Sequence, residues 1–270
     1  ARVRATCHHK QPGSAVKEVE YVTCDLTLRE NCQTAVQGVD FICHCAANTS
    51  GAATMATTPM VHVTPNVVMN ALLLEAAYEA QVKKFLWLSS TTGYPDTGGA
   101  VTESQMFEGE PFEKYFFVGW MKRFTEVLCR MYGEKLPRPM PTIVLRPSNV
   151  YGPGDKFDPQ HSHVTAALIR KVVERQQPLE VWGTGDDVRD LIYVDDMVEA
   201  ILLALEKLDS YCALNIGLGR SYSVKEALRF ILDADSWQDA TVVFDPSKPT
   251  MIPVRRVDVE VVGRGEQIPA

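Results

Sequence analysis

The residues between Arg146 and His163 carry the densest group of side chains in this chain that could bind a ligand or move a proton. They include Asn149, two aspartates and two histidines, and imidazole is the side chain that titrates closest to neutral pH. An apolar β-type run precedes this stretch, and a helix-like run over 164–173 follows it. A polar loop after a buried strand is where an open α/β sheet places its ligand. The alternative is a long surface connection whose Pro and Gly residues only make turns.

Length and composition narrow the classes of protein to which the chain could belong. Its 270 residues, 46% of them hydrophobic, can bury the core of one large domain or two smaller ones. A net charge of -7 without a Lys/Arg run argues against nucleic acid as a partner. The sequence shows no apolar stretch long enough to span a bilayer and no signal peptide, so we expect no membrane partner.

The cysteines and histidines indicate neither a disulfide framework nor a metal site. Seven cysteines are scattered without CxxC spacing, and free thiols suit a reducing compartment, which favours the cytoplasm. Cys43 and Cys45 fall in an apolar run, where we expect them to be small buried hydrophobic residues. The histidines show neither HxxxH nor HExxH spacing, so no metal is expected.

Apolar strands alternate with helices through the first half of the chain. We expect strands over 2–6, 19–23, 40–45, 84–88 and 141–145, and helices over 29–37, 59–80 and 115–132. This order indicates right-handed βαβ units and a mostly parallel, doubly wound sheet. The strands are almost continuously apolar, as in a sheet that is covered on both faces.

After residue 164 the units become shorter. We expect strands over 179–182, 190–193 and 212–216, and helices over 164–176, over 195–207 and from Ser223 onward. Ser223 and Glu226 have the S-x-x-E spacing of a capping box, which satisfies backbone donors at a helix start. This predicts a larger domain over 1–148 and a smaller one over 149–270, with 177–200 returning to the first.

Short matches to one protein family occur in the family's own order along nearly the whole chain. The chain resembles the extended short-chain dehydrogenases/reductases of the NAD(P)-dependent nucleotide-sugar epimerase/dehydratase family, and within it the GDP-L-fucose synthase branch. The matches are Asp25-Leu26, His44-Cys45-Ala46-Ala47, Asn66, Ser89-Ser90-Thr91, Lys122-Arg123, the run from Arg146 to Pro153, Ser162-His163-Val164, the run from Val181 to Gly185, Arg189-Asp190, Val194-Asp195-Asp196 and the run from Phe244 to Pro249. The matches at Ser162-His163 and Trp182 favour the fucose synthase branch.

The resemblance implies a fold, a chemistry and an assembly. The fold is a Rossmann-like, doubly wound parallel sheet that binds a dinucleotide, followed by a smaller C-terminal α/β domain that binds the substrate. The chemistry is hydride transfer at carbon 4 of a GDP-hexose or other nucleotide-diphosphate hexose, with NADP or NAD as cofactor. The assembly is a homodimer in which the helices carrying Asn66 and Lys122 pair with their symmetry mates in a four-helix bundle.

The resemblance also gives individual residues a role. The catalytic candidates are Ser90, Thr91, Lys122, His163 and, as a displaced acid or base, Tyr115. The cofactor-binding candidates are His9, Lys10, Asp25, Leu26, Ala46, Ala47, Asn66, Ser89, Lys122, Pro147, Asn149 and Val150. The substrate-binding candidates, whose Arg forks suit phosphate and whose Trp suits base stacking, are Asn149, Val164, Arg170, Lys171, Trp182, Arg189 and Lys248. Each has an ordinary alternative as a turn, capping, packing or solvated residue.

Three features depart from the family pattern. The chain has no GxGxxG turn, which would hold the dinucleotide diphosphate at a helix N-terminus. The family's catalytic tyrosine lies four residues before the lysine; here that position is Val118, and Tyr115 lies seven before Lys122, two turns away on the same helical face. Thr92 stands where the fucose synthases carry a cysteine. The alternative function is therefore a weak or inactive relative that binds a nucleotide sugar or dinucleotide in a structural or regulatory role.

The end of the first strand bears on the choice of cofactor. NAD-specific sites usually place an acid there to bind the ribose hydroxyls. This chain reads Cys7-His8-His9-Lys10, which has no acid and has basic groups that suit a 2′-phosphate. The sequence therefore favours NADP, and the alternative is an ordinary exposed turn.

Overall fold

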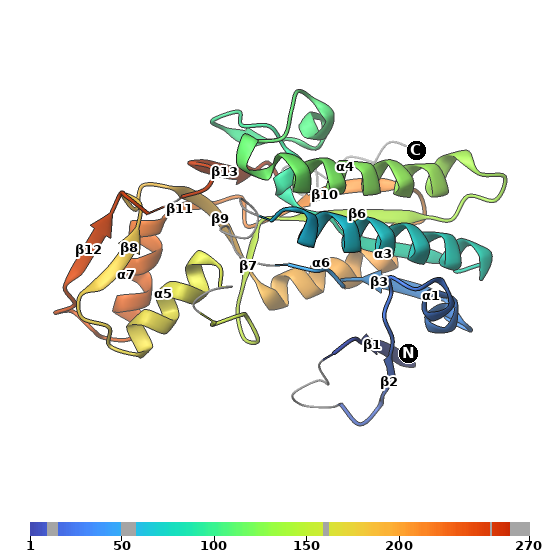
Figure 1. Ribbon diagram of the computed structural model, residues 1–270, viewed down its shortest axis with the longest axis horizontal. Helices are drawn as coiled ribbons and strands as arrows, with labels where there is room; N and C mark the ends of the chain where they lie inside the picture. Colours follow the sequence, from blue (N-terminus) through green and yellow to red (C-terminus); the bar gives the residue numbers. More distant parts are fainter. Residues whose placement is uncertain (10–15, 50–57, 159–161, 249, 260–270) are drawn as a thin grey trace.

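The centre of the fold is a four-stranded parallel sheet with strand order β10-β6-β4-β3 (Figure 1). The computed structural model describes residues 1–9, 16–49, 58–158, 162–248 and 250–259. The strands of this sheet are β3 (Phe41–His44), β4 (Lys84–Leu88), β6 (Thr142–Pro147) and β10 (Cys212–Ile216). Every neighbouring pair is parallel, which confirms the predicted α/β fold with a parallel sheet.

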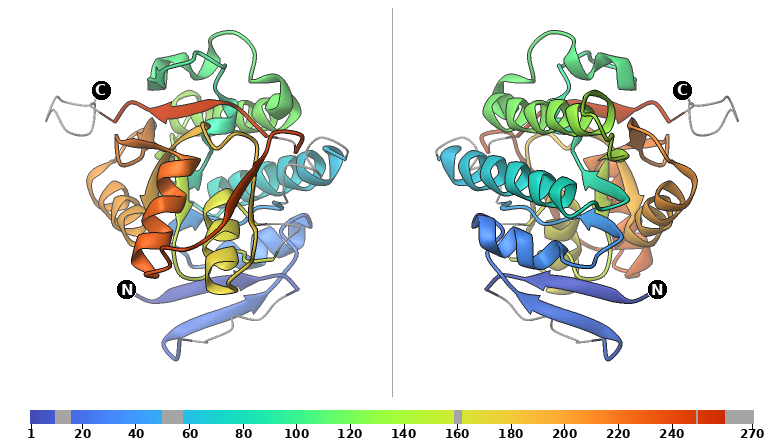
Figure 2. Two further views of the ribbon diagram at one scale, coloured as in Figure 1. Left: turned by 90° about the vertical axis from the view of Figure 1, so that its left-hand side faces the viewer. Right: turned by 90° about the vertical axis from the view of Figure 1, so that its right-hand side faces the viewer.

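Helices cover both faces of this sheet. Helices α1 (Arg29–Val36), α3 (Met60–Glu79) and α4 (Phe116–Arg130) share one hydrophobic cluster, and α6 (Val194–Lys207) packs on the opposite face (Figures 1 and 2). Alternate side chains of β4 divide between the two layers: Phe85 and Trp87 pack in the first cluster, and Leu86 packs in the second. Because both faces are buried, the strand sequences are apolar throughout.

The first two strands lie apart from this sheet. β1 (Val3–Cys7) and β2 (Val19–Thr23) form a separate parallel pair, and Figures 1 and 2 show it at a distance from β3. Among the described residues β3 pairs only with β4. Cys43 and Cys45 are exposed, so the expectation that they are buried is wrong. The reason is that the hydrophobic cluster beneath α6 includes residues of β4 and β6 and none of β3.

The later strands build a smaller lobe. Its central strand, β9 (Val188–Tyr193), pairs with β7 (Asn149–Tyr151), β11 (Ser221–Ser223) and β13 (Val254–Val257). A second pair, β8 (Leu179–Trp182) with β12 (Val242–Asp245), packs with α5 (Val164–Val173) and α7 (Val224–Ala234). Within the described chain, α6 and β10 return to the main sheet, whereas β8 and β9, expected in the first domain, pair with strands of this lobe.

Local sequence sets the shorter features. Ser223 Oγ accepts the Glu226 N–H at 3.2 Å and the Glu226 carboxylate accepts the Ser223 N–H at 2.8 Å, which confirms the capping box. Between β4 and β6 lie η1 (Thr91–Gly93), β5 (Ala100–Val101), η2 (Glu103–Phe107), η3 (Glu113–Tyr115) and the π-helical turn η4 (Met131–Lys135). In the part of the chain that the structure describes, no helix is both long enough and apolar enough to cross a bilayer.

Strand β13 joins the two lobes. It pairs with β9 on one side and with β5 on the other. Its buried Arg255 donates a hydrogen bond to the Pro95 carbonyl at 3.3 Å, on the loop that follows β4. Just before the strand, the Thr250 carbonyl accepts a hydrogen bond from Lys114. Residues 250–257 therefore hold the loops after β4 against the strand that carries Arg189.

Candidate active site

Ser90 lies at the carboxyl end of β4, where the chain turns into η1. Its backbone is extended, and its Oγ accepts hydrogen bonds from the Thr92 N–H at 3.2 Å and from Thr92 Oγ1 at 3.1 Å. Thr91 is buried. The turn thus fixes the Ser90 oxygen as an acceptor and leaves its hydroxyl hydrogen to point toward an incoming group.

Lys122 approaches the same strand end from α4. Its Nζ donates to the Leu88 carbonyl at 3.2 Å, two residues before Ser90, and lies 4.7 Å from the centre of the Trp87 ring. Burial lowers the pKa of Lys122 to about 8, against the attraction of the Glu126 carboxylate. The Lys122 ammonium group thus lies near the end of the strand that precedes Ser90, and the catalytic roles expected for both residues stay predictions.

The two positions considered for a tyrosine acid differ in their surroundings. Val118 is half-buried in the first turn of α4, which packs closely on η1: a Cβ on Gly119 would lie 2.7 Å from the Thr92 carbonyl oxygen. Tyr115 precedes the helix with a non-helical backbone, so it does not continue the helical face of Lys122. Its charged neighbours are Arg189, Arg255 and Asp187, and burial raises its pKa. The structure thus places Tyr115 near the smaller lobe and does not bring it to Lys122.

A buried polar network beneath the strand end was not found from the sequence. Ser89 Oγ donates to the Glu126 carboxylate at 2.6 Å, so the side chain of this expected cofactor ligand points into the core. Arg146 donates to the same carboxylate from Nε at 3.0 Å and from Nη2 at 2.6 Å. It also donates from Nη1 to Tyr94 Oη at 2.8 Å, and Tyr94 donates to Asn215 Oδ1 at 2.7 Å. The only sequence signal was the spacing of Glu126, one helical turn after Lys122.

The residues expected at the adenosine end of a dinucleotide occupy the turn after β2. Asp25 Oδ1 accepts hydrogen bonds from the Thr27 N–H at 2.9 Å and the Thr27 hydroxyl at 2.7 Å, which lower the pKa of Asp25. Leu26 is buried in the core, and its side chain is therefore a packing residue. His9 is exposed beside His8, and Lys10 lies outside the described residues. The second Asp25 oxygen lies 3.6 Å from the His8 ring nitrogen.

The end of β3 presents exposed backbone. Ala46 and Ala47 follow the strand and are exposed, as expected for a segment that a cofactor approaches closely. Asn66 of α3 is buried and binds the backbone of Asn48, the residue after Ala47. Its side chain accepts the Asn48 N–H at 2.9 Å and donates to the Asn48 carbonyl at 2.9 Å. The Asn66 amide therefore positions this loop, and its donors and acceptors are already used.

The junction of β6 and β7 contributes Pro147, Asn149 and Val150, all half-buried. Asn149 Nδ2 donates to the Asp190 carbonyl at 3.0 Å, which ties β7 to β9. Asp190 itself is buried, and its carboxylate accepts the N–H groups of Leu218 and Gly219 at 3.0 and 3.1 Å. The run from Arg146 to Gly152 therefore links the main sheet to the smaller lobe.

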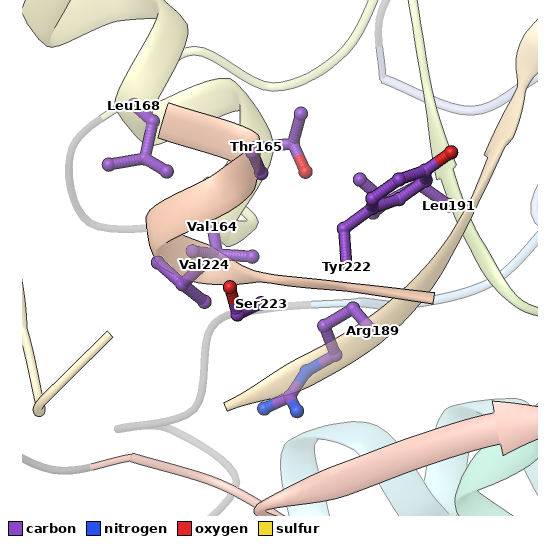
Figure 3. Close-up of a pocket in the computed structure, with 9 residues that line it drawn as sticks. Val164, Thr165, Leu168, Arg189, Leu191, Tyr222, Ser223 and Val224 are labelled. Atoms are coloured by element: carbon purple, nitrogen blue, oxygen red, sulfur yellow. The ribbon is translucent and has the colours of Figure 1, made fainter. Parts of the chain in front are cut away.

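Two expected substrate ligands, Val164 and Arg189, line one small pocket of about 10 Å³ (Figure 3). The other lining residues come from α5, β9, β11 and α7: Thr165, Leu168, Leu191, Tyr222, Ser223, Val224 and Ala227. The Arg189 guanidinium donates to the Pro253 carbonyl at 3.2 Å and lies 3.3 Å from Asp187 Oδ2. Because ligand pockets usually enclose about 300–1,000 Å³, this pocket as it stands is too small to hold a nucleotide.

The remaining substrate candidates lie elsewhere in the smaller lobe. Trp182 is 51% exposed, so its ring is available for stacking and is not core filler. Its strand neighbour in the register is Asp245, whose carbonyl accepts the N–H of Lys248. Arg170 is held by Glu174 at 2.7 Å, and Lys171 donates to the Glu180 carbonyl at 2.6 Å. The structure brings Trp182 and Lys248 to one edge, whereas Arg170 and Lys171 are engaged within the lobe.

His163 forms the N-cap of α5. Its imidazole is exposed, and its side chain makes no capping hydrogen bond. The ordinary alternative, in which the ring caps the helix, is therefore not what the structure shows.

Comparison with known proteins identifies the family. Residues 2–217 match the NAD dependent epimerase/dehydratase family. The chain belongs to this family. The GDP-L-fucose synthase of Sinorhizobium fredii (strain NBRC 101917 / NGR234) is 30% identical over 224 residues, which are 80% of this chain and 69% of that protein. The GDP-L-colitose synthase of Yersinia pseudotuberculosis is 28% identical over 225 residues, 81% of this chain and 72% of that protein.

The solved structures agree on the fold. A GDP-L-fucose synthetase from Naegleria fowleri bound to NADP has a TM-score of 0.81 at 24% identity, covering 92% of this chain and 79% of that one. The predicted resemblance to the epimerase/dehydratase family and to fucose synthase-like proteins is thus confirmed.

The family uses NAD or NADP, and the described residues fit parts of such a dinucleotide. The exposed Ala46 and Ala47 and the ammonium of Lys122 suit its ribose end, and the second oxygen of Asp25, 3.6 Å from the His8 ring nitrogen, suits its adenine. The described residues before β4 offer no comparable glycine turn at a helix N-terminus for the diphosphate of the dinucleotide. In the described part of the chain before β4, the only glycine with positive φ is Gly38, which follows α1 and lies at no helix N-terminus.

Proposed function

We propose that this protein is an NAD(P)-dependent reductase or epimerase that acts at carbon 4 of a nucleotide-diphosphate hexose, with NADP and a GDP-sugar as its pair of ligands. The observation that carries the proposal is the meeting of Lys122 and Ser90 at one strand end. The Lys122 Nζ donates to Leu88 O at 3.2 Å, two residues before the Ser90 hydroxyl, in a chain of the epimerase/dehydratase family. The bound nicotinamide supplies the hydride donor or acceptor.

The chain's own residues would place and protonate the sugar. Ser90 would donate its hydroxyl hydrogen to the oxygen on carbon 4, because its own oxygen is already an acceptor for Thr92. Lys122 would be the proton source in place of the absent tyrosine. Its pKa of about 8 keeps it largely protonated at neutral pH yet able to release a proton. Thr91 and His163 are the alternatives, through bridging water.

The choice of a GDP-sugar rests on the relatives and on the smaller lobe. The two curated relatives named above are a GDP-L-fucose synthase and a GDP-L-colitose synthase. Arg189, at the edge of the small pocket, can present a guanidinium fork to a diphosphate once its contacts with Asp187 and with the Val188 and Pro253 carbonyls are exchanged. The exposed ring of Trp182 offers a face for a base.

The NADP preference rests on the strand end beside Asp25. The exposed imidazoles of His8 and His9 follow β1, the run from Cys7 to Lys10 contains no acid, and the Asp25 carboxylate of the neighbouring turn lies 3.6 Å from the His8 ring nitrogen. A cation there suits a 2′-phosphate.

A homodimer through α3 and α4 is part of the same proposal. On α4 four large apolar side chains are exposed at helical spacing: Phe117 (59%), Trp120 (41%), Phe124 (48%) and Val127 (51%). Helix α3 packs beside α4 and exposes Val61 and Val68. A continuous apolar face on two adjacent helices suits an isologous contact with a second copy, which would bury it.

A second candidate function is a protein that binds these ligands without turnover. Val118 favours it, because this residue stands where the family carries its catalytic tyrosine.

The test is to incubate the purified protein with NADPH and a GDP-4-keto-hexose. Nicotinamide oxidation and sugar reduction are followed together, the latter by mass spectrometry. Sugar reduction that Lys122→Met abolishes supports the enzyme. Tight binding of both ligands by calorimetry, with no reduction, supports the binding protein. No binding of either ligand refutes both.

A further inference from the structure

Cys43 and Cys45 form a thiol pair that the proposed reaction does not use. Their Sγ atoms lie 3.4 Å apart, and both residues are exposed. The other cysteines are buried or half-buried: Cys7, Cys24, Cys32, Cys129 and Cys212. The pair is therefore the one place in the described chain where two accessible thiols are in contact.

The strand geometry permits a covalent bond between them. Alternate residues of a strand point to the same face and have Cα atoms about 6.4–6.8 Å apart, which is within the range found for disulfides. The sulfurs must move from 3.4 Å to about 2.05 Å. Cys45 lies one residue beyond the last paired residue of β3 and can make that movement. Between them, His44 points to the opposite face and is anchored through Nε2 to Asn70 Oδ1 at 2.8 Å.

The local chemistry distinguishes the two sulfurs. Either sulfur can donate the hydrogen bond between the two thiols; with Cys43 as the donor, the bond lowers the pKa of Cys45 and makes Cys45 the more readily ionised nucleophile. Its thiolate attacks a peroxide oxygen, the O–O bond breaks, and a sulfenic acid and hydroxide form. The Cys43 thiolate then attacks that sulfur and releases hydroxide, which takes up a proton. In total two thiols and one hydrogen peroxide give one disulfide and two waters.

We propose that Cys43 and Cys45 are a redox-active dithiol that a peroxide closes to a disulfide, and that this closure weakens dinucleotide binding. The second half rests on the proposed function, because Ala46 and Ala47, the segment expected against the cofactor, follow Cys45 directly. Drawing the two sulfurs together shifts the backbone of Cys45 and the segment attached to it.

The first experiment tests the disulfide alone. The protein is treated with hydrogen peroxide, and its intact mass and peptide map are measured. We expect the loss of two hydrogen atoms and a peptide containing both cysteines in disulfide form. Cys43→Ser should stop at a dimedone-trappable sulfenic acid on Cys45, and Cys45→Ser should not oxidise at this site. The matched control Cys7→Ser, at a half-buried thiol, should oxidise like the wild type. Two thiols that remain alkylatable after peroxide, or a disulfide to another cysteine, would overturn the proposal.

The second experiment tests the consequence. NADP affinity is measured by calorimetry on reduced, peroxide-treated and re-reduced protein. We expect oxidation to weaken binding by at least about tenfold, with recovery on reduction and no effect of peroxide on Cys43→Ser/Cys45→Ser. Equal affinity of the reduced and oxidised forms would refute the switch. If reduced protein does not bind NADP while the disulfide maps correctly, the proposed function fails and the redox-active dithiol stands.

Discussion

Removing the carboxylate of Glu126 should destabilise the protein more than removing the whole ion pair. Glu126 is fully buried, and its carboxylate accepts three hydrogen bonds, one from Ser89 and two from Arg146. Glu126→Leu leaves the Arg146 guanidinium, whose side chain is 3% exposed, without its counter-ion. Breaking a buried pair in this way costs about 3–5 kcal/mol. Losing the acceptor for the Ser89 hydroxyl adds about 1–3 kcal/mol.

The double variant Glu126→Leu/Arg146→Met is the matched comparison. It removes both charges and fills their space with apolar atoms, a change that is often neutral or stabilising by about 1–4 kcal/mol. Tyr94 loses the Arg146 donor at 2.8 Å but keeps Asn215 as its acceptor at 2.7 Å. We therefore expect the double variant to be more stable than Glu126→Leu by at least about 2 kcal/mol.

The measurement is a double-mutant cycle by urea unfolding. It compares the wild type, the two single variants and the double variant, whose unfolding midpoints are converted to free energies with one common m-value. The reasoning is refuted if the double variant loses as much stability as the two single variants added together. It is also refuted if Glu126→Leu alone costs less than about 1 kcal/mol, because a guanidinium that tolerates isolation is not buried in solution.

Four further outcomes are expected. Val118→Tyr places a phenol one helical turn before Lys122 and should raise turnover ~10²–10⁴-fold. A melting curve is measured beside it, because overpacking costs about 1–3 kcal/mol. A folded variant with no gain in turnover contradicts the proposal that the protein is an enzyme. Arg189→Ala should weaken GDP-sugar binding by on the order of 2–3 kcal/mol in calorimetry and spare NADP, whereas equal losses would mean a structural role. Because the pKa of Lys122 is about 8, its ammonium is lost as pH rises through that value, so NADPH affinity should fall there in wild type and stay flat in Lys122→Gln. Phe124→Glu should give monomers in light scattering, whereas the control Leu202→Glu, at a side chain 61% exposed on α6, should not.

The sequence predicted the parts of the fold that depend on periodicity. The β2 strand from Val19 to Thr23 and the long helix α3 were found from their apolar spacing, and the Ser223 capping box from two residues. These features are local, so a single sequence contains their cause. Which strands would pair was less accessible, because pairing depends on residues distant in the chain. The placement of β8 and β9 in the smaller lobe is an example.

The candidate site likewise contains residues that the sequence predicted and residues that it missed. Lys122 and Ser90 were found through family spacing, and the structure brings them to one strand end. Tyr115 was placed by assuming that α4 continues back to it, but the helix begins at Phe116. The Glu126–Arg146 pair was missed because charged residues are ordinarily assigned to the surface, and only tertiary contacts show that each finds its partner in the core.

The position of β13 has a consequence for the order in which the molecule becomes functional during synthesis. The main sheet is complete once β10 has formed, and its hydrophobic clusters lie entirely before residue 217. The strand that ties the loop after β4 to β9 is made some forty residues later, at Val254–Val257. A nascent chain can therefore hold a folded main sheet, with β9 already joined to β7, before β13 adds its pairing with both β9 and β5. Translation products that stop before β13 would lack the strand that pairs with both β5 and β9.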